Sequence, residues 1–222
     1  IFSFFKISNI LSRTISLLKG VGIKNIIVVV GFEKESVLKL LDPSIVTVEQ
    51  KKRLGTGHAV KIAMSKIPKS AEHVLVLNGD DSFLFSPALF KELLETHSQK
   101  NSAITFLTID LKDPTGLGRI IRNSKGKIEG IVEEKDATQK QKKIKEINAA
   151  CYLFSYAFLA SSISKLPKSH ITGEYYIVSL IEIADHKKMP IETLRHRNLK
   201  WRGVNTIEEL KEAEQIIGTE NG

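Results

Sequence analysis

The chain has 222 residues, of which 42% are hydrophobic and 26% charged. This composition is that of a globular protein large enough for one α/β domain. No apolar run approaches the ~20 residues that span a bilayer, so we expect no membrane partner. The net charge of +8 raises RNA binding as an alternative. Because the Lys and Arg residues are scattered and no aromatic residues interleave with them, we expect no nucleic-acid partner.

The only cysteine is Cys151, which lies in an apolar run and has no partner for an internal disulfide. We expect it to pack in the core. A chain without disulfides fits a reducing compartment, and this favours a cytoplasmic protein.

Helical and strand patterns alternate through the first half of the chain, which predicts an α/β, doubly wound fold. A helix is expected to begin after Ser86 as N-cap, with Pro87 in its first turn. The continuous apolar run from Val74 to Leu77 predicts a central strand of a parallel sheet covered on both faces. In this half, helices are predicted over 14–19, 33–41 and up to residue 63, and strands over 26–30, 45–48 and 73–77.

The second half has shorter strands with more polar connections. Strands are predicted over 103–109, 119–121, 128–132 and 147–154, and a helix is expected near Gly173. A last helix is predicted from Thr206, where Glu209 completes a capping box, to Gly218. The stretch 139–143 is interpreted as a solvated loop. There are no internal repeats, and we expect residues 1–222 to form a single domain.

Two adjacent carboxylates, Asp80 and Asp81, follow the 73–77 strand. Ligands of α/β sheets bind beyond the carboxyl ends of the strands, and Mg²⁺ is held by one or two carboxylates with water and phosphate oxygens. The alternative is that these residues cap the next turn. We expect Asp80 to face a site and Asp81 to point away as a cap.

Glycine-rich and polar segments follow other predicted elements. Gly55 and Gly57 precede a helix, where backbone N–H groups can face an anion or a base, although turn chemistry gives the same pattern. His58 is expected to be a helix-start residue and not a metal ligand. Gly118 can let a ligand approach the backbone, or it can belong to a hairpin turn. Polar groups around 133–136 and 146–148 suit the hydroxyl and amide groups of a sugar, although scattered loop charge would look similar.

Taken in order, these motifs resemble one family over residues 12–217, the pyrophosphorylase domain of bacterial N-acetylglucosamine-1-phosphate uridylyltransferase. The segments that carry the resemblance are Gln50 with Leu54-Gly55-Thr56-Gly57-His58-Ala59, Leu77-Asn78-Gly79-Asp80, Gly116-Leu117-Gly118-Arg119-Ile120, Ile131-Val132-Glu133-Glu134-Lys135-Asp136-Ala137, Glu146-Ile147-Asn148, Gly173-Glu174-Tyr175-Tyr176 and Gly203-Val204-Asn205.

The resemblance implies a Rossmann-like, doubly wound mixed sheet and formation of UDP-N-acetylglucosamine and pyrophosphate from UTP and N-acetylglucosamine 1-phosphate. By motif matching, Asp80 and Asn205 hold Mg²⁺ as the catalytic metal site. Gln50, Gly55 and Thr56 bind the nucleotide. Gly118, Glu133, Asn148 and Tyr176 bind the sugar phosphate. A homo-oligomer is left open. The alternatives are a related transferase with another nucleotide or sugar, and a non-catalytic remnant that binds nucleotide sugars.

The chain departs from the family pattern in several places. The family's opening Gly-rich loop, which cradles the triphosphate, is absent, so we expect a domain truncated at its amino terminus and doubtful activity for this chain alone. Residues 4–12 resemble an altered remnant of the segment that comes after that loop. Asp81 adds a carboxylate beside the expected metal ligand, Val178-Ser179 stands for Thr-Asp, and Thr206 replaces an Asn. The family's carboxy-terminal acetyltransferase domain is also missing.

Overall fold

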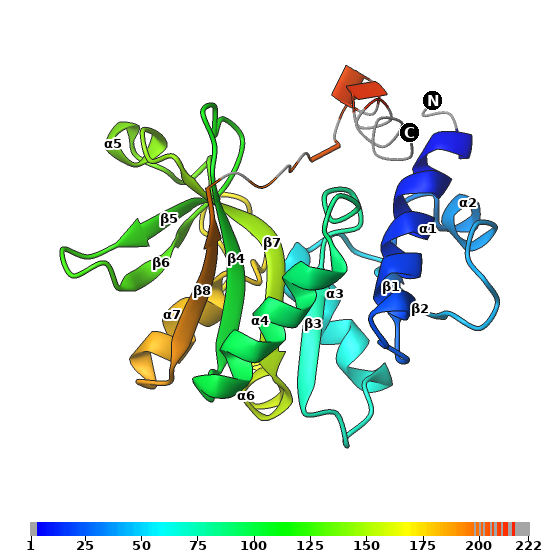
Figure 1. Cartoon of the computed structure of the whole chain (residues 1–222), viewed down its shortest axis with the longest axis horizontal. Coiled ribbons are helices and arrows are strands. Elements are labelled where there is room, and N and C mark those ends of the chain that lie inside the picture. Colours follow the sequence, from blue (N-terminus) through cyan, green and yellow to red (C-terminus); the bar gives the residue numbers. More distant parts are fainter. Residues whose placement is uncertain are drawn as a thin grey trace.

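The computed structural model describes residues 4–197 and positions 199, 201, 203, 204, 206, 208, 209, 211, 212 and 215. Figure 1 shows its elements. In chain order they are α1 (Phe4–Gly20), β1 (Ile27–Val30), α2 (Lys34–Leu38), β2 (Val46–Glu49), α3 (Thr56–Ala63), η1 (Met64–Lys66), β3 (His73–Leu77), α4 (Pro87–Gln99), β4 (Ile104–Asp110), β5 (Arg119–Arg122), β6 (Ile128–Val132), α5 (Gln139–Lys142), β7 (Glu146–Ser155), α6 (Tyr156–Ser162), η2 (Ile163–Lys165), α7 (Ser179–His186) and β8 (Ile191–His196).

The larger sheet is built around β7, the longest strand in the described residues. Its order is β6-β5-β7-β4-β8, and β3 also pairs with β7. The pairs of β7 with β3, β4 and β5 are antiparallel, whereas β4 and β8 run parallel. The sheet is therefore mixed, as predicted for this α/β fold.

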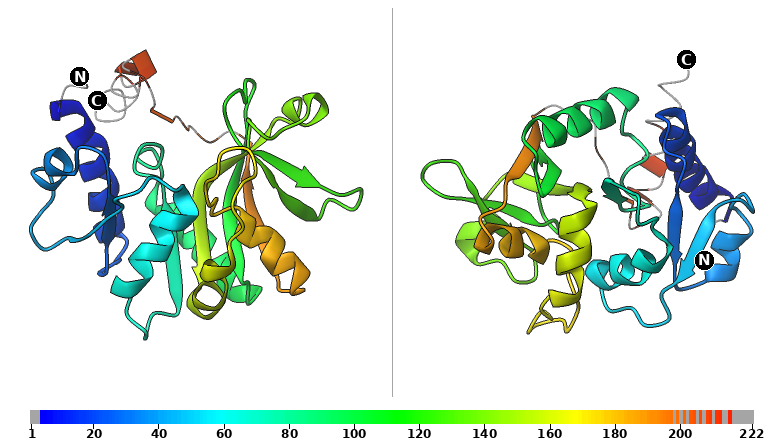
Figure 2. Two further views of the ribbon diagram at one scale, coloured as in Figure 1. Left: turned by 180° about the vertical axis from the view of Figure 1, so that it is seen from behind. Right: turned by 90° about the horizontal axis from the view of Figure 1, so that it is seen from below.

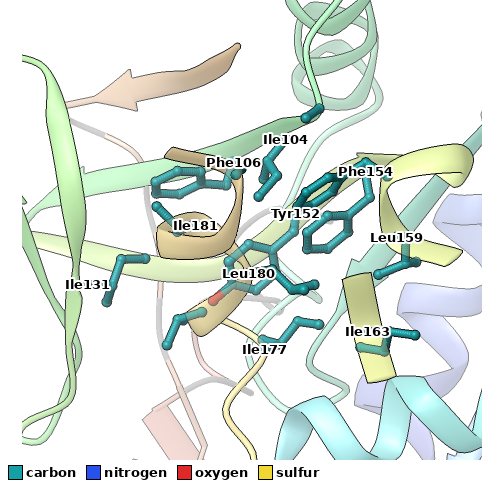
Figure 3. Packing of buried hydrophobic residues seen from close by; sticks show 14 of the residues in the cluster. Ile104, Phe106, Ile131, Tyr152, Phe154, Leu159, Ile163, Ile177, Leu180 and Ile181 are labelled. Carbon is teal, nitrogen blue, oxygen red and sulfur yellow. The ribbon is translucent and has the colours of Figure 1, made fainter. Parts of the chain in front are cut away.

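Side chains of β7 alternate between two hydrophobic cores because successive residues of a strand point to opposite faces. Tyr152 and Phe154 face the core that is covered by α6 and α7, with Ile181 and Leu159 (Figure 3). Cys151 and Leu153 face the core under α4. Cys151 is fully buried and forms no disulfide, so its prediction as a core residue is confirmed.

The prediction for the 73–77 strand was wrong in one respect. β3 is not a central strand of a parallel sheet, because its one strand partner among the described residues is the antiparallel β7. Its residues are exposed or half-buried. A continuous apolar run does not by itself distinguish a central strand from a strand that is partly buried by helices. β3 lies at the edge of the described sheet.

Other elements also differ from the predictions. The helix expected near Gly173 begins at Ser179, because Gly173 has a positive φ of 72° and the segment after it bonds to another loop. The expected loop 139–143 contains the short helix α5, which opens with a capping box of Thr138 and Gln141. α6 and β8 were not predicted. The N-cap Ser86 of α4 and the capping box of Thr206 and Glu209 are confirmed.

A smaller sheet of the parallel strands β1 and β2 lies beside α1 and α2 (Figures 1 and 2). β3 is the strand of the larger sheet that lies nearest to it. α1 connects the two parts, since Ile10 packs with Phe83 and Leu84, and the Arg13 Nε donates to the carbonyl of Phe83 at 2.9 Å. Among the described residues, no helix has the length and apolar character needed to cross a membrane.

Candidate active site

The loop between β2 and α3 is docked onto the segment 174–177. The N–H of Gly57 donates to the Tyr175 carbonyl at 2.8 Å, and the N–H of Tyr175 donates to the Leu54 carbonyl at 2.8 Å. The N–H of Ile177 donates to the Thr56 hydroxyl at 3.1 Å. Segments more than a hundred residues apart in sequence are thus joined by main-chain contacts.

The glycines of this loop are required by the close approach. Gly55 has a φ of 91°, and a Cβ at this position would lie 2.6 Å from the Tyr175 carbonyl oxygen. A Cβ at Gly57 would lie 2.5 Å from Leu166. At Gly55 the contact is with backbone and φ is positive, so only glycine fits, whereas a side chain at Gly57 would have to displace the end of Leu166. The pattern predicted backbone N–H groups that face an anion or a base, or a turn, and in the structure the N–H of Gly57 donates instead to the Tyr175 carbonyl.

Gln50 lies at the start of the same loop and holds its shape. Its N–H donates to the Val30 carbonyl at 2.7 Å, which continues the pairing of β2 with β1. Its side-chain Nε2 lies 3.0 Å from both the Gly55 carbonyl and the His58 Nδ1. His58 lies in the first turn of α3, as predicted.

The predicted sugar residues Gly118, Glu133 and Asn148 lie together. A Cβ at Gly118 would lie 3.3 and 3.4 Å from the two carboxylate oxygens of Glu133, so the carboxylate faces the bare glycine backbone. The Gly118 carbonyl accepts from the Asn148 N–H at 3.0 Å. They meet because Gly118 precedes β5 and Glu133 follows β6, at one end of an antiparallel hairpin that is attached to β7.

Tyr176 lines the same cavity as Glu133. The cavity measures about 370 Å³ and also contains Asp136, Lys168 and Ser169. The Tyr176 hydroxyl lies 2.7 Å from the Thr172 hydroxyl. The volume is in the range of small-molecule sites. Residues 174–177 therefore bond to the glycine loop through Tyr175 and Ile177, and they line the cavity through Tyr176.

Two contributors to this site were missed in the sequence. Asn148 Nδ2 donates to the buried hydroxyl of Tyr152, which fixes the amide. Tyr152 lies within an apolar strand run, so no local pattern distinguishes it from a core aromatic residue. Lys168 enters from the irregular segment after η2, for which neither periodicity nor spacing gave a signal.

Asp80 and Asp81 differ in burial. Asp80 is exposed at the surface, and its pKa is raised, first by desolvation and then by the charge of Glu209. Asp81 is buried; one of its carboxylate oxygens accepts from the Asn78 amide at 3.3 Å, and Oδ1 has no hydrogen-bond partner among the described residues. Its predicted role as a cap is wrong, because this side chain bonds to no helix or turn N–H of the following segment.

The backbone of Asp80 contacts the segment that carries Asn205. The Asp80 carbonyl accepts from the Val204 N–H at 3.2 Å. Asn205 itself lies outside the described residues, and its sharing of a Mg²⁺ ion with Asp80 stays a prediction. The surroundings of Asp80 suit a hard cation, because the carboxylate is accessible, lies near the negative charge of Glu209 and forms no ion pair within the described chain.

A larger, open depression of about 720 Å³ contains Glu146 but none of the residues assigned to the metal, the nucleotide or the sugar phosphate. Within it Arg122 pairs with Glu146, Arg195 pairs with Asp110, and the Lys145 Nζ donates to the Lys112 carbonyl. We therefore assign the candidate site to the glycine loop, the Glu133 cavity and Asp80.

Comparison with known proteins identifies the family of the chain. Residues 1–220 match the family described as nucleotidyl transferase. The bifunctional protein GlmU of Thermoanaerobacter pseudethanolicus is 37% identical over 203 residues, which cover 91% of this chain and 44% of that protein. GlmU of Caldicellulosiruptor saccharolyticus is 40% identical over 194 residues, with 86% and 42% covered.

The chain thus spans about half the length of the curated relatives that it matches. A solved structure described as a glucose-1-phosphate thymidylyltransferase from Bacillus anthracis has a TM-score of 0.73 at 16% identity, and the match covers 93% of this chain and 81% of that one. This likeness supports the Rossmann-like mixed fold. The chain belongs to the nucleotidyl transferase family.

Proposed function

We propose that this domain transfers a uridylyl group from UTP to N-acetylglucosamine 1-phosphate, with UDP-N-acetylglucosamine and pyrophosphate as products. The family and its GlmU relatives support this reaction. A cytoplasmic location follows from the proposed substrates and is consistent with the unpaired, buried Cys151.

The observation that carries the proposal is the bridge formed by residues 174–177. This segment bonds to the loop that would bind uridine, through Tyr175 and Thr56, and it brings Tyr176 to the cavity that contains Glu133. A nucleotide on the loop and a sugar phosphate beside Glu133 would therefore be held by one continuous framework, as a reaction between two bound substrates requires.

The chemistry needs no nucleophile from the protein. A phosphate oxygen of the sugar phosphate attacks the α-phosphorus of UTP, a P–O bond forms, and the bond to the β-phosphate oxygen breaks to release pyrophosphate. A phosphate monoester is largely dianionic at neutral pH because its second pKa is about 6. The residues of this chain would therefore act by positioning the substrates and by stabilising charge.

Glu133 and Asn148 supply the polar groups for the sugar. The Glu133 carboxylate can accept from sugar hydroxyl groups beside the Gly118 backbone, where there is no side chain to block them. Asp80, with Asn205, would hold Mg²⁺, which when bound neutralises phosphate charge.

The test is release of pyrophosphate from UTP and N-acetylglucosamine 1-phosphate with Mg²⁺, measured for the chain as given and for a form extended upstream by the family's glycine-rich loop. Substitution of UTP by other nucleoside triphosphates, and of the sugar phosphate by glucose 1-phosphate, tests the substrate assignment. We expect release with UTP and the N-acetylated sugar in the extended form. Binding of the sugar phosphate without turnover in either form would indicate a non-catalytic remnant.

A further inference from the structure

Arg119 is the largest of the side chains that are almost fully buried in the described structure, and it is charged. It is 1% exposed and lies at the start of β5, directly after Gly118. A buried guanidinium is costly unless it is paired, so its surroundings are informative. None of the roles assigned above uses this residue.

The guanidinium of Arg119 joins its own segment to two others. One Nη donates to the Leu117 carbonyl, two residues earlier in the turn before β5. The other lies 2.7 Å from a carboxylate oxygen of Glu134 and 3.4 Å from the Lys142 carbonyl at the end of α5. Lys142 Nζ lies 3.4 Å from the second oxygen of Glu134 and completes the cluster.

These segments are the ones that carry the sugar-binding candidates. Leu117 precedes Gly118, and Glu134 follows Glu133. Arg119 also pairs with a neighbouring strand on each side. It lies opposite Val132 of β6 and opposite Ile147 of β7. The ion pair therefore fixes the two ends of the β5–β6 hairpin at the place where Gly118 and Glu133 face each other.

We propose that Arg119 is a positioning residue for the sugar-phosphate subsite, acting through Glu134 to hold the Glu133 carboxylate against the Gly118 backbone. This inference rests on the proposed function. Arg119 does not touch the sugar itself. The forked shape of the guanidinium matters, because Lys would keep the charge but could not reach the Leu117 carbonyl and Glu134 at the same time with two rigidly held N–H groups.

The test compares Arg119→Lys, Arg119→Met and Glu134→Gln with the control Arg122→Lys. Arg122 is on the same strand and forms a comparable buried ion pair with Glu146, but it contacts none of the three segments. Each variant is made in whichever form of the chain releases pyrophosphate. The steady-state KM for each substrate, kcat and the urea midpoint are measured.

We expect the Arg119 variants and Glu134→Gln to lower kcat/KM for the sugar phosphate about tenfold to a hundredfold, through a raised KM, as displacement of a binding group does. The KM for UTP stays unchanged. Arg122→Lys lowers the urea midpoint but leaves both KM values unchanged. If Arg119→Met does not fold, Glu134→Gln breaks the same ion pair by exchanging one oxygen for an amide.

An unchanged KM for the sugar phosphate in folded Arg119→Lys and Glu134→Gln overturns the inference, as does an equal rise in Arg122→Lys. If the parent chain does not turn over, this failure by itself does not test the role of Arg119. If the parent still binds N-acetylglucosamine 1-phosphate by calorimetry, the same comparison is made with its Kd. If it neither turns over nor binds, the proposed function fails and this inference with it.

Discussion

Glu133 and Glu134 are neighbours in the chain, but their carboxyl groups have opposite surroundings. The pKa of Glu133 is raised, first by desolvation and then by the charge of Asp136. Desolvation also acts to raise the pKa of Glu134, but the hydrogen bonds and charges of Arg119 and Lys142 outweigh it and lower the value. The carboxylate of Glu134 is thus used in contacts with Arg119 and Lys142, whereas the carboxylate of Glu133 can still accept hydrogen bonds from a ligand.

This difference leads to a prediction for Glu133→Ala in an active form of the chain. Loss of a hydrogen bond from a charged group should weaken binding of the sugar phosphate by roughly 1 to 3 kcal/mol. The KM for the sugar phosphate should rise, and the KM for UTP should not change. Glu95→Ala, on the exposed side of α4, is the control. An unchanged KM for the sugar phosphate would refute the assignment of Glu133.

His97 provides a second prediction at the scale of single residues. It is 1% exposed, its Nδ1 lies 2.9 Å from the Thr105 hydroxyl, and its ring meets the ring of His73 at 5.0 Å. Desolvation, with a smaller effect of the charge of His73, lowers the pKa of His97 to about 4. The unfolded chain takes up this proton below about pH 6.5, whereas the folded chain does not.

Because only the unfolded chain binds this proton between about pH 6.5 and pH 4, the free energy of unfolding is not reduced by His97 above pH 6.5. It falls as the pH drops from 6.5 toward 4, by about 3 kcal/mol in total. The free energy of unfolding, measured in urea at several pH values, should fall less steeply for His97→Gln than for the parent. His170→Gln, at an exposed position, should follow the parent curve. Parallel curves for the parent and His97→Gln would show that His97 is protonated in the folded chain.

At the scale of elements, local patterns predicted most helices and strands. Some errors come from long-range pairing, whereas the short helix α5 was missed although its capping box of Thr138 and Gln141 is a local signal. The caps of α4 and of the helix after Thr206 are visible in the sequence because a cap acts within three residues. The strand partner of β3 is not visible in the sequence, because an apolar run does not specify which other strand will pair with it. The contact between Gly55 and Tyr175 was likewise unpredictable, because nothing near Gly55 indicates that residues 174–177 pack against it.

That contact gives a prediction for Gly55→Ala. Both Gly55 and Gly126 have positive φ values, 91° and 78°, but a Cβ at Gly126 meets nothing within 4 Å. Gly126→Ala therefore reports only the cost of the conformation, about 1 to 2 kcal/mol. Gly55→Ala adds overlap with the Tyr175 backbone, at a φ of 91° and ψ of 175° that essentially only glycine adopts, and should destabilise by about 1 to 3 kcal/mol more. Equal free energies of unfolding for the two variants would mean that residues 174–177 are not packed against the loop.

At the scale of the whole molecule, the two sheets are not joined by strand pairing. Within the described residues β1 pairs with β2 alone and β3 with β7 alone, so each has one edge without a strand partner. α1 links the parts through Ile10, Phe83 and Leu84, but a helix does not satisfy the N–H and C=O groups of a strand edge.

The last prediction concerns the chain as given. Apolar strand edges with unpaired backbone groups are prone to aggregation, and the family's glycine-rich loop, with its cradle for the triphosphate, has no counterpart among the motifs of these 222 residues. We expect the chain as given to be poorly soluble and to release no measurable pyrophosphate, whereas the form extended upstream by that loop is soluble and active. Light scattering and a pyrophosphate assay on both forms provide the measurement. A soluble, monomeric chain that turns over at ~1 to 10³ s⁻¹ without the extension would show that the triphosphate is bound by residues already present.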